Sequence, residues 1–401
     1  MAANFAPSTI WTGDNLPVLR GMNSACVDLI YLDPPFNSNR TYKAPIGSKA
    51  AGASFKDAWT LDDVDVCEHG ELADRNSAAY AVIEAARLAH GKGMQSYLVF
   101  MAVRLLEMHR VLKPTGSIYL HCDPTASHYL KLLMDGIFGK GQFRNEIIWS
   151  YRTGGVSKNY FAHKHDVLFY YSGGLLFNMQ TEKAYTKSKS RKPGLVNYGA
   201  GKAIFHEDDQ GVYNLVSMRD VWEIPYLNSQ AKERLGYPTQ KPLALLDRII
   251  KASSNPGDLV LDPFCGCATA LVAADRLRRQ WAGIDLSPLA VKLVKERIVV
   301  DPAANPLWAG PVGLDAPPRR TDLGDLPNYR THRHRLYGEQ EGVCPGCNTH
   351  FPFRVMDVDH ILPRSKGGTD HPDNLQLLCA GCNRSKGGKT MAEWRAAQRS
   401  T

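Results

Sequence analysis

Short apolar runs that end beside an acidic residue recur along residues 1–300, and no other feature of this 401-residue chain constrains its fold as strongly. The runs lie at residues 27–32, 116–121, 258–261 and 281–284, and a helical pattern covers residues 97–112. Alternation of buried strands with helices is typical of a parallel α/β sheet. Open sheets of this kind bind ligands at the carboxyl ends of their strands. The sequence therefore predicts an α/β fold with acidic residues at its ligand-binding edge.

The composition indicates a globular protein rather than a disordered or membrane-spanning one. Hydrophobic residues make up 44% of the chain and charged residues 22%, which is ordinary for a folded protein. No apolar run approaches the ~18 residues needed to span a bilayer, and the N-terminal residues lack the pattern of a secretion signal. We expect no membrane association. The net charge of +8 is compatible with a polyanionic partner but is weak support for one.

Four of the nine cysteines form two close pairs, Cys344–Cys347 and Cys379–Cys382. An odd total, the absence of a secretion signal and the CxxC spacing indicate reduced thiols that hold a metal, and hence a cytoplasmic protein. Residues 331–401 are too few to form a deep core without such a metal. Four thiolates are the ligand set of a closed, tetrahedral zinc site, so we expect structural Zn²⁺ here.

Three segments interrupt the alternation of strands and helices. Residues 60–95 read as an insertion, residues 151–236 are irregular, and residues 301–330 hold six prolines and read as a stiff linker. Within residues 181–202, six basic residues face one acidic residue and alternate with two tyrosines. Such a run is either a solvated loop or a segment that contacts phosphates.

Two motifs follow predicted strands directly: Asp33-Pro34-Pro35-Phe36 and the stretch from Asp262 to Ala270. Alone, the first is a plausible strand terminator, because two prolines end a strand ladder. The second is a glycine-containing turn of the kind found in many α/β folds. Because both lie where strands end, together they favour a ligand site.

With these motifs, residues 8–300 resemble the β class of amino-methylating DNA methyltransferases. The resemblance also includes Thr12-Gly13-Asp14, the segment from Arg110 to Pro114, and Pro238-Thr239-Gln240-Lys241-Pro242. It implies a Rossmann-like sheet that binds S-adenosylmethionine, double-stranded DNA as the partner, and a target-recognition region at residues 151–236. Because enzymes of this class often dimerise, it also implies that a homodimer can form.

The resemblance assigns roles to individual residues. Asp33 and the Pro34 carbonyl, within the motif completed by Pro35, would accept hydrogen bonds from the target amine, and Phe36 would stack on a base extruded from the duplex. Asp285 would bind the ribose hydroxyls of the cofactor. The remaining residues expected to bind the cofactor are Asp14, Lys241, Asp262, Phe264, Cys265, Gly266 and Thr269. The alternative for Lys241 is an ordinary surface lysine.

Residues 331–401 resemble the HNH endonucleases, through the segments Val358–Asp370, Asn374–Leu378 and Asn383–Gly387. The resemblance implies a small zinc-stapled ββα-metal domain. In it His360 would be the general base, oriented by a hydrogen bond involving Asn374. Asp359 and Asn383 would hold Mg²⁺ or Mn²⁺. Asn383 stands where many members of the family have histidine, which leaves the metal preference open.

We therefore predict a methyltransferase over residues 1–300, a linker over 301–330 and an HNH endonuclease over 331–401. Such a chain would methylate adenine N6 and hydrolyse DNA, as a single-chain restriction–modification or defence enzyme does. Adenine is favoured because, in the family that the chain resembles, aspartate in the first motif position accompanies adenine more often than cytosine. Three alternatives stay open: an N4-cytosine enzyme, a tail that only binds or targets DNA, and a non-catalytic DNA-binding protein.

Overall fold

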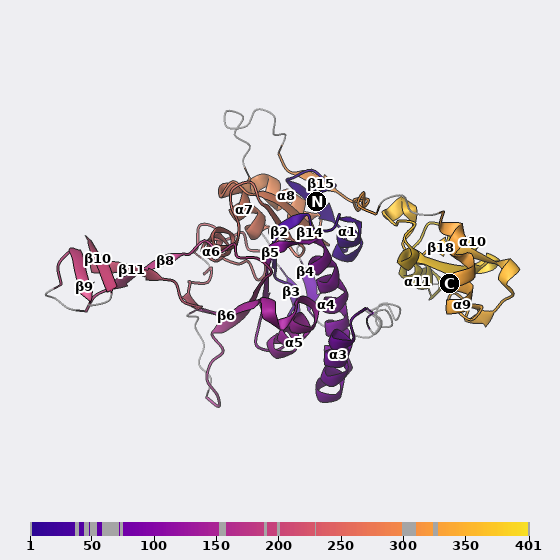
Figure 1. Cartoon of the computed structure of the whole chain (residues 1–401), viewed down its shortest axis with the longest axis horizontal. Coiled ribbons are helices and arrows are strands. Elements are labelled where there is room, and N and C mark those ends of the chain that lie inside the picture. Colours follow the sequence, from indigo (N-terminus) through magenta and orange to yellow (C-terminus); the bar gives the residue numbers. More distant parts are fainter. Residues whose placement is uncertain are drawn as a thin grey trace.

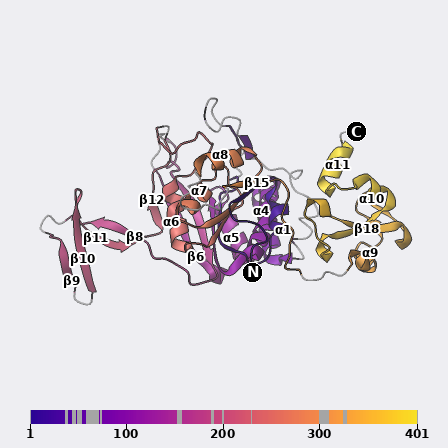
Figure 2. The same cartoon turned by 90° about the horizontal axis from the view of Figure 1, so that it is seen from above.

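The computed structural model describes residues 2–36, 40–43, 48, 54–57, 72, 75–151, 158–187, 191–198, 201–228, 230–298, 310–323 and 328–399. In these residues a central body carries a β arm at one end of the long axis and a small C-terminal domain at the other (Figures 1 and 2). None of the described helices combines the length and the apolar character that a membrane crossing requires.

The body is built on a nine-stranded sheet with the order β12-β6-β7-β5-β2-β13-β14-β1-β15. Its strands are β1 (Thr9–Thr12), β2 (Val27–Leu32), β5 (Leu112–Cys122), β6 (Phe143–Ser150), β7 (His165–Ser172), β12 (Val221–Glu223), β13 (Leu259–Asp262), β14 (Gln280–Asp285) and β15 (Val312–Leu314). Every neighbouring pair is parallel except the two pairs that contain β7, which are antiparallel. The four strands expected from the sequence are present as β2, β5, β13 and β14. The α/β fold is confirmed.

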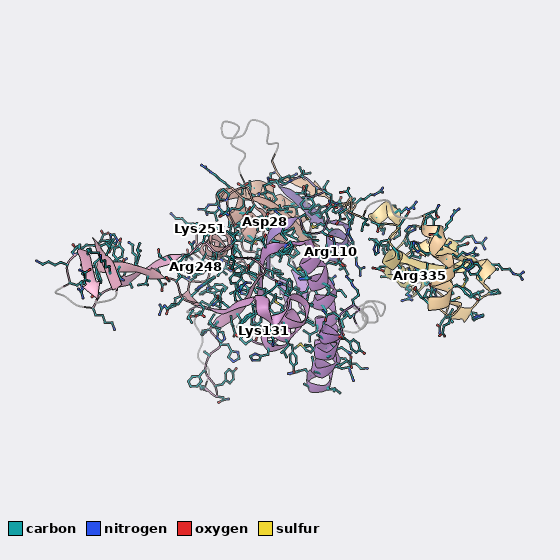
Figure 3. All side chains as sticks on the ribbon, viewed as in Figure 1. Asp28, Arg110, Lys131, Arg248, Lys251 and Arg335 are labelled. Atoms are coloured by element: carbon teal, nitrogen blue, oxygen red, sulfur yellow. The ribbon has the colours of Figure 1, made fainter. Side chains whose placement is uncertain are left out.

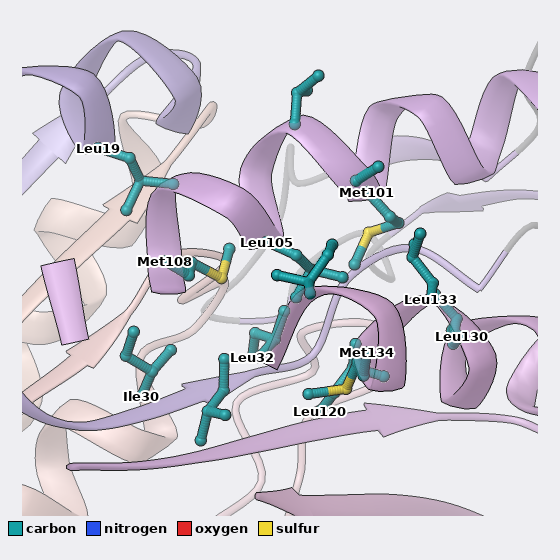
Figure 4. Close-up of a cluster of buried hydrophobic side chains, with 14 of the residues drawn as sticks. Leu19, Ile30, Leu32, Met101, Leu105, Met108, Leu120, Leu130, Leu133 and Met134 are labelled. Carbon is teal, nitrogen blue, oxygen red and sulfur yellow. The ribbon is translucent and has the colours of Figure 1, made fainter. Parts of the chain in front are cut away.

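Helices cover both faces of this sheet. One face is covered by α1 (Asn15–Gly21), α3 (Ser77–His90), α4 (Lys92–Val111) and α5 (Ser127–Phe138), and the other by α6 (Leu243–Ser253), α7 (Thr269–Arg276) and α8 (Leu289–Arg297). Strand β2 shows why its sequence is almost continuously apolar: Ile30 and Leu32 point into the first core, and Leu29 and Tyr31 into the second. Figure 4 shows the first core, where Met101, Leu105 and Met108 of α4 lie over β2.

Part of the range expected to be a linker belongs to the body. Strand β15 pairs with β1 in parallel, which makes it the last strand of the sheet. Beyond it, the Ser24 backbone N–H donates to Asp322 at 2.8 Å, and the Asn23 side chain donates to Thr321 at 2.8 Å. The proline content did not reveal this strand, because it is only three residues long. The domain boundary itself stays a prediction, and residues 301–309 and 324–327 lie outside the described residues.

Within the expected target-recognition region, residues 181–187, 191–198 and 201–217 form the four-stranded antiparallel arm β8-β11-β10-β9. Its strands are β8 (Thr181–Tyr185), β9 (Gly194–Tyr198), β10 (Gly201–Asp208) and β11 (Gly211–Ser217). In the insertion expected at residues 60–95, helix α3 is described, whereas residues 58–71 lie outside the described residues. Residues 40–43 and 54–57 pair as the separate hairpin β3 (Arg40–Lys43) and β4 (Ser54–Asp57).

The C-terminal domain has a core of its own, which includes Leu336, Met356, Leu377 and Trp394. Its elements are α9 (Arg333–Glu339), β16 (Val343–Cys344), β17 (Thr349–His350), β18 (Met356–His360), β19 (Leu375–Cys379), α10 (Ala380–Lys386) and α11 (Met391–Arg399). The antiparallel pair β18–β19 runs directly into α10, which is the ββα arrangement expected from the sequence.

Candidate functional site

A cavity of ≈ 610 Å³ opens at the carboxyl edge of the sheet, beyond the ends of β2, β13 and β14. All twelve residues expected from the sequence to serve methyl transfer line it: Asp14, Asp33, Pro34, Pro35, Phe36, Lys241, Asp262, Phe264, Cys265, Gly266, Thr269 and Asp285. Arg104 and Tyr237 also line it. Sequence reasoning missed these two, because Arg104 lies inside an apolar helix and Tyr237 in an irregular segment.

Asp33 is held on one side by Lys241. The ammonium Nζ lies 2.5 Å from Asp33 Oδ2, and the Lys241 side chain is 8% exposed. The other carboxylate oxygen, Oδ1, is buried and has no hydrogen-bond partner among the described residues. Lys241 Nζ also lies 5.2 Å from the centre of the Phe36 ring. Lys241 therefore contacts the expected catalytic motif, although the sequence assigned it to the cofactor.

Two carboxylates lie at the ends of β13 and β14. Asp285 accepts hydrogen bonds from the backbone N–H groups of Gly266 and Ser287, each at 2.8 Å. Burial raises the pKa of Asp285 to about 6, against these two bonds. Burial also raises the pKa of Asp262 well above its ordinary value, although the Phe264 backbone N–H donates to this carboxylate. Burial disfavours the charged form of both carboxylates. A bound cation or bound hydroxyl groups would compensate for the lost contact with water, so these acids are suited to bind such groups.

Gly266 has the backbone conformation that its role in a tight turn requires. Its φ is +50°, in the left-handed region, and an added Cβ would lie 3.2 Å from Cε1 of Tyr237. A side chain here would be strained and would push into the aromatic wall of the cavity. Because Gly266 has no side chain, its backbone can lie close to a ligand bound in the cavity.

Asp14 lies at the N-terminus of α1 and accepts from the Leu16 backbone N–H at 3.1 Å. It also pairs with Arg104 at 2.7 Å, while Arg104 donates to Asn15 at 2.7 Å. Asp14 thus reaches the cavity, and much of its hydrogen-bonding capacity is used within the protein.

In the C-terminal domain, Cys344, Cys347, Cys379 and Cys382 bring their Sγ atoms within 4.8 Å of one another. The Cys379 backbone N–H donates to Cys344 Sγ at 3.3 Å, which suits a thiolate acceptor. Four sulfur ligands at this separation fit a tetrahedral Zn²⁺ site. The cluster joins β16 and the following turn to β19 and α10, so a bound ion would connect both halves of the domain.

His360 lies at the end of β18, and its Nε2 atom lies 2.8 Å from Asp370 Oδ1. The expected orienting bond from Asn374 is replaced in the structure. The Asn374 side chain binds the loop backbone instead, accepting from Leu362 N–H at 2.8 Å and donating to the Thr369 carbonyl at 2.8 Å. An amide with both ends engaged by its own loop braces that loop, and Asp370, which sequence reasoning missed, is the side chain that contacts the His360 ring. The role of either residue in orienting His360 stays a prediction.

The expected magnesium ligand Asp359 already has two partners. The Lys386 ammonium lies 3.0 Å from Oδ2 of Asp359, and the Gln376 amide donates to the same carboxylate at 2.9 Å. The Lys386 side chain is fully buried. Asp359 and Asn383 supply the oxygen ligands that Mg²⁺ prefers, but a divalent ion would compete with the Lys386 charge for Asp359. The present arrangement therefore fits a metal at Asp359 less well than zinc at the cysteines.

Comparison with known proteins agrees with the two parts of the structure. Residues 27–296 match the family model described as DNA methylase, and residues 344–389 match the model described as HNH endonuclease. The chain is 28% identical to the DNA adenine methyltransferase YhdJ of Escherichia coli (strain K12), over 73% of this chain and 83% of that protein. It is 28% identical to the type II methyltransferase M.EcaI of Enterobacter cloacae, over 73% of this chain and 69% of that protein. The crystal structure of the M1.HpyAVI–SAM complex is 16% identical, with a TM-score of 0.39, and covers 73% of this chain and 99% of that one.

Proposed function

Because the chain belongs to the DNA methylase family and carries an HNH endonuclease domain behind it, we propose that it transfers a methyl group from S-adenosylmethionine to adenine N6 in double-stranded DNA. The observation that carries this proposal is the state of Asp33: Lys241 holds Oδ2, while Oδ1 is buried, without a partner among the described residues. A buried acceptor of this kind requires a donor. The exocyclic amine of an extruded base supplies one.

The residues of the motif account for activation of that amine. Its nitrogen is a poor nucleophile because its lone pair is delocalised into the ring. When Asp33 Oδ1 and the Pro34 carbonyl accept its two N–H groups, the lone pair becomes available for attack. Phe36 offers a ring face on which the extruded base can stack. S-adenosylmethionine, when bound, supplies a methyl group on a positively charged sulfur.

The other half of the cavity fits that cofactor. Asp285, which the Gly266 and Ser287 backbones hold in place, faces the cavity as an acceptor for ribose hydroxyls. Asp262 would bind the ammonium group of the methionine part, and the close approach at Gly266 leaves room for its backbone. Phe264, Cys265 and Thr269 would form the surrounding wall, together with Asp14 and the buried Arg104 that pairs with it.

The arm supports double-stranded DNA as the substrate. Lys192 and Lys202 lie on it, as do Lys183 and the half-exposed Tyr185, both of which also bind Asp208 of the arm. Where the arm leaves the body, Figure 3 shows Arg248 and Lys251 of α6, and Arg248 lies 5.0 Å from the ring centre of Trp222. Cations and aromatic rings together suit a phosphate backbone and its bases. The proposal places the enzyme in the cytoplasm, and formation of a homodimer stays a prediction.

For the C-terminal domain we propose DNA hydrolysis, with His360 as general base, oriented by Asp370. Asp359 and Asn383 would hold Mg²⁺ or Mn²⁺ once Lys386 releases Asp359. A second candidate is a zinc domain that only binds or targets DNA. The ion pair between Asp359 and Lys386 favours that candidate, because it neutralises the expected metal ligand within the protein.

Two assays on the purified chain test these proposals. Transfer of a tritium-labelled methyl group to plasmid DNA, followed by mass spectrometry of the digested DNA, should yield N6-methyladenine. Finding N4-methylcytosine alone would overturn the base assignment but leave methyl transfer. Incubation of methylated and unmethylated plasmid with Mg²⁺ or Mn²⁺ should yield cut or nicked products, and no cleavage under any of these conditions would favour the targeting domain.

A further inference from the structure

A chain of four polar side chains, of which Tyr31 and His121 are buried and Asp166 and Tyr151 partly buried, runs beside the catalytic motif, and the proposed chemistry does not use it. The Tyr31 hydroxyl lies 2.9 Å from His121 Nδ1, and His121 Nε2 lies 3.1 Å from Asp166 Oδ2. The Tyr151 hydroxyl donates to the other oxygen of Asp166 at 3.0 Å. Four successive elements of the body contribute these residues: β2, β5, β7 and the end of β6. We refer to them as the Tyr31–Tyr151 chain.

The protons of this chain can be assigned from the chemistry of its ends. Burial, together with the charge of Asp33, raises the pKa of Tyr31 well above its ordinary value, so this phenol stays a donor. Its O–H then donates to Nδ1 of His121, which leaves the Nε2–H to donate to Asp166. Burial alone would raise the pKa of Asp166, but His121, Lys241 and the hydrogen bond from Tyr151 together outweigh it, and the pKa is lowered. Every member is therefore satisfied in one consistent set of hydrogen bonds.

Such a network is unlike its surroundings. His121 is fully buried and Tyr31 is 2% exposed, in the middle of a largely apolar sheet. An apolar set of side chains could fill this space without the need to satisfy four polar groups. A fully satisfied polar network instead fixes one geometry of the side chains that form it. Such a network can also hold a neighbouring group in a fixed position.

The contacts of His121 indicate which neighbouring groups these are. Its ring centre lies 5.9 Å from that of Phe36 and 5.5 Å from that of Trp149. Tyr31, at one end, lines the cavity two residues before Asp33 on the same segment. Asp166 and Tyr151, at the other end, lie within the expected target-recognition region, residues 151–236. The chain therefore connects the base-stacking side of the motif with that region.

We propose that the Tyr31–Tyr151 chain is a positioning device that holds Phe36 and Asp33 in register with the strands carrying the DNA-recognition segment, so that an extruded base meets both. The inference rests on the proposed role of Asp33 in methyl transfer. It makes His121 and Asp166 positioning residues rather than catalytic ones, because they act through Phe36 and Tyr31. It also predicts a specific phenotype: slow methyl transfer with unchanged cofactor binding, because Asp262 and Asp285 end β13 and β14, which lie on the opposite side of β2 from β5 and β7.

The test uses the full-length protein and three variants. His121→Leu removes both hydrogen bonds, Tyr31→Phe removes only the donor, and His121→Asn keeps an acceptor near the place of Nδ1. The matched control is Tyr119→Phe on the same strand, whose hydroxyl is also buried and lies 2.7 Å from Ser253 Oγ. Once sequencing has identified the methylated site, a duplex with 2-aminopurine at the target base reports extrusion by its fluorescence.

We expect His121→Leu to lower the methyl-transfer rate by about 10- to 100-fold, as a small misplacement of reacting groups does, and to reduce the 2-aminopurine signal. Its calorimetric affinity for S-adenosylmethionine should stay within twofold, and His121→Asn should recover part of the rate. Tyr31→Phe, the milder change, covers the case in which His121→Leu does not fold. The inference is overturned if folded His121→Leu and Tyr31→Phe methylate as fast as the parent, or if Tyr119→Phe loses as much activity as they do. Absence of methyl transfer by the parent itself would instead contradict the proposed function.

Discussion

Lys241 Nζ lies 2.5 Å from Asp33 Oδ2, and this contact joins two motifs that are 208 residues apart in the chain. The sequence placed Asp33 in the catalytic motif and Lys241 in a segment expected to bind the cofactor. In the structure a single lysine reaches both the carboxylate and the Phe36 ring. The ammonium thus neutralises and orients the carboxylate that is proposed to accept a hydrogen bond from the target amine.

Lys241→Met should therefore lower methyl transfer strongly, because it leaves the partly buried Asp33 carboxylate without its charged partner. Breaking a buried ion pair on one side costs about 3–5 kcal/mol, so the variant should also melt at a lower temperature. Lys241→Arg should keep the charge and part of the activity. Steady-state rates and thermal melting measure both effects, and full activity in Lys241→Met would remove Lys241 from the site.

Asp33→Ala should abolish methyl transfer and leave cofactor binding largely intact. The carboxylate acts on the amine of the target base, whereas the cofactor is proposed to bind at Asp262 and Asp285. Calorimetry with S-adenosylmethionine and a filter assay for labelled DNA separate the two properties. A methyl-transfer rate close to that of the parent would show that another group accepts the hydrogen bond of the target amine.

Asp285→Ala should weaken S-adenosylmethionine binding by ~1–3 kcal/mol, the contribution of hydrogen bonds to a charged group. The pKa of Asp285 is raised to about 6, so its ionised form, the better acceptor for ribose hydroxyls, is lost as the pH falls through that value. Cofactor affinity should then decrease below pH ~6, by up to about tenfold per pH unit. Protein stability should change in the opposite direction, because a raised carboxyl pKa favours the folded state at low pH. An affinity that is independent of pH, or unaffected by Asp285→Ala, contradicts the assignment.

The zinc site and the proposed nuclease metal should respond differently to chelation. Cys379→Ser should unfold the C-terminal domain locally, because ~10 kcal/mol or more of apparent zinc-binding energy is folding energy in small zinc domains. Mild EDTA should stop cleavage reversibly with the domain still folded, because oxygen ligands hold Mg²⁺ weakly. Methyl transfer should survive both treatments. Circular dichroism and zinc analysis follow the fold, and unfolding under mild EDTA would argue against a tightly held structural ion.

His360→Ala should lose DNA cleavage while keeping zinc, fold and methyl transfer. Asp370→Asn should reduce cleavage less, because the amide still reaches His360 but no longer carries a charge. Asn374→Ala should act mainly on stability, since this side chain binds the loop backbone. Plasmid cleavage and thermal melting distinguish the three variants. If His360→Ala cuts as well as the parent, the tail is a targeting domain.

The parts of the fold that depend on local sequence patterns could be predicted from the sequence. The parts that depend on long-range contacts could not. Strand β2 was expected at residues 27–32 and lies there, because a strand buried on both faces must be apolar throughout. The four cysteines were recognisable because CxxC spacing is a local consequence of metal geometry. By contrast, nothing near Lys241 indicates that it will face Asp33.

The C-terminal domain and the linker show the same limit. Asp370 follows His360 by 10 residues and Asn374 by 14, so spacing could not decide which one contacts the imidazole, and the loop geometry selected Asp370. Strand β15 was hidden among prolines, because a strand of three residues has no period to detect. The buried histidine between Tyr31 and Asp166 also left no signal, because its partners lie on separate strands.

The anchoring of Asp322 beside Ser24 sets the length of chain that can separate the body from the C-terminal domain. The 3₁₀ turn that leads into α9 is capped at Asn328, and six residues of chain extend to at most about 20 Å. A short connecting segment therefore limits how far the C-terminal domain can lie from the methyltransferase body. Any cut made by this domain should consequently fall in cis, within a bounded distance of the base that the same molecule has engaged.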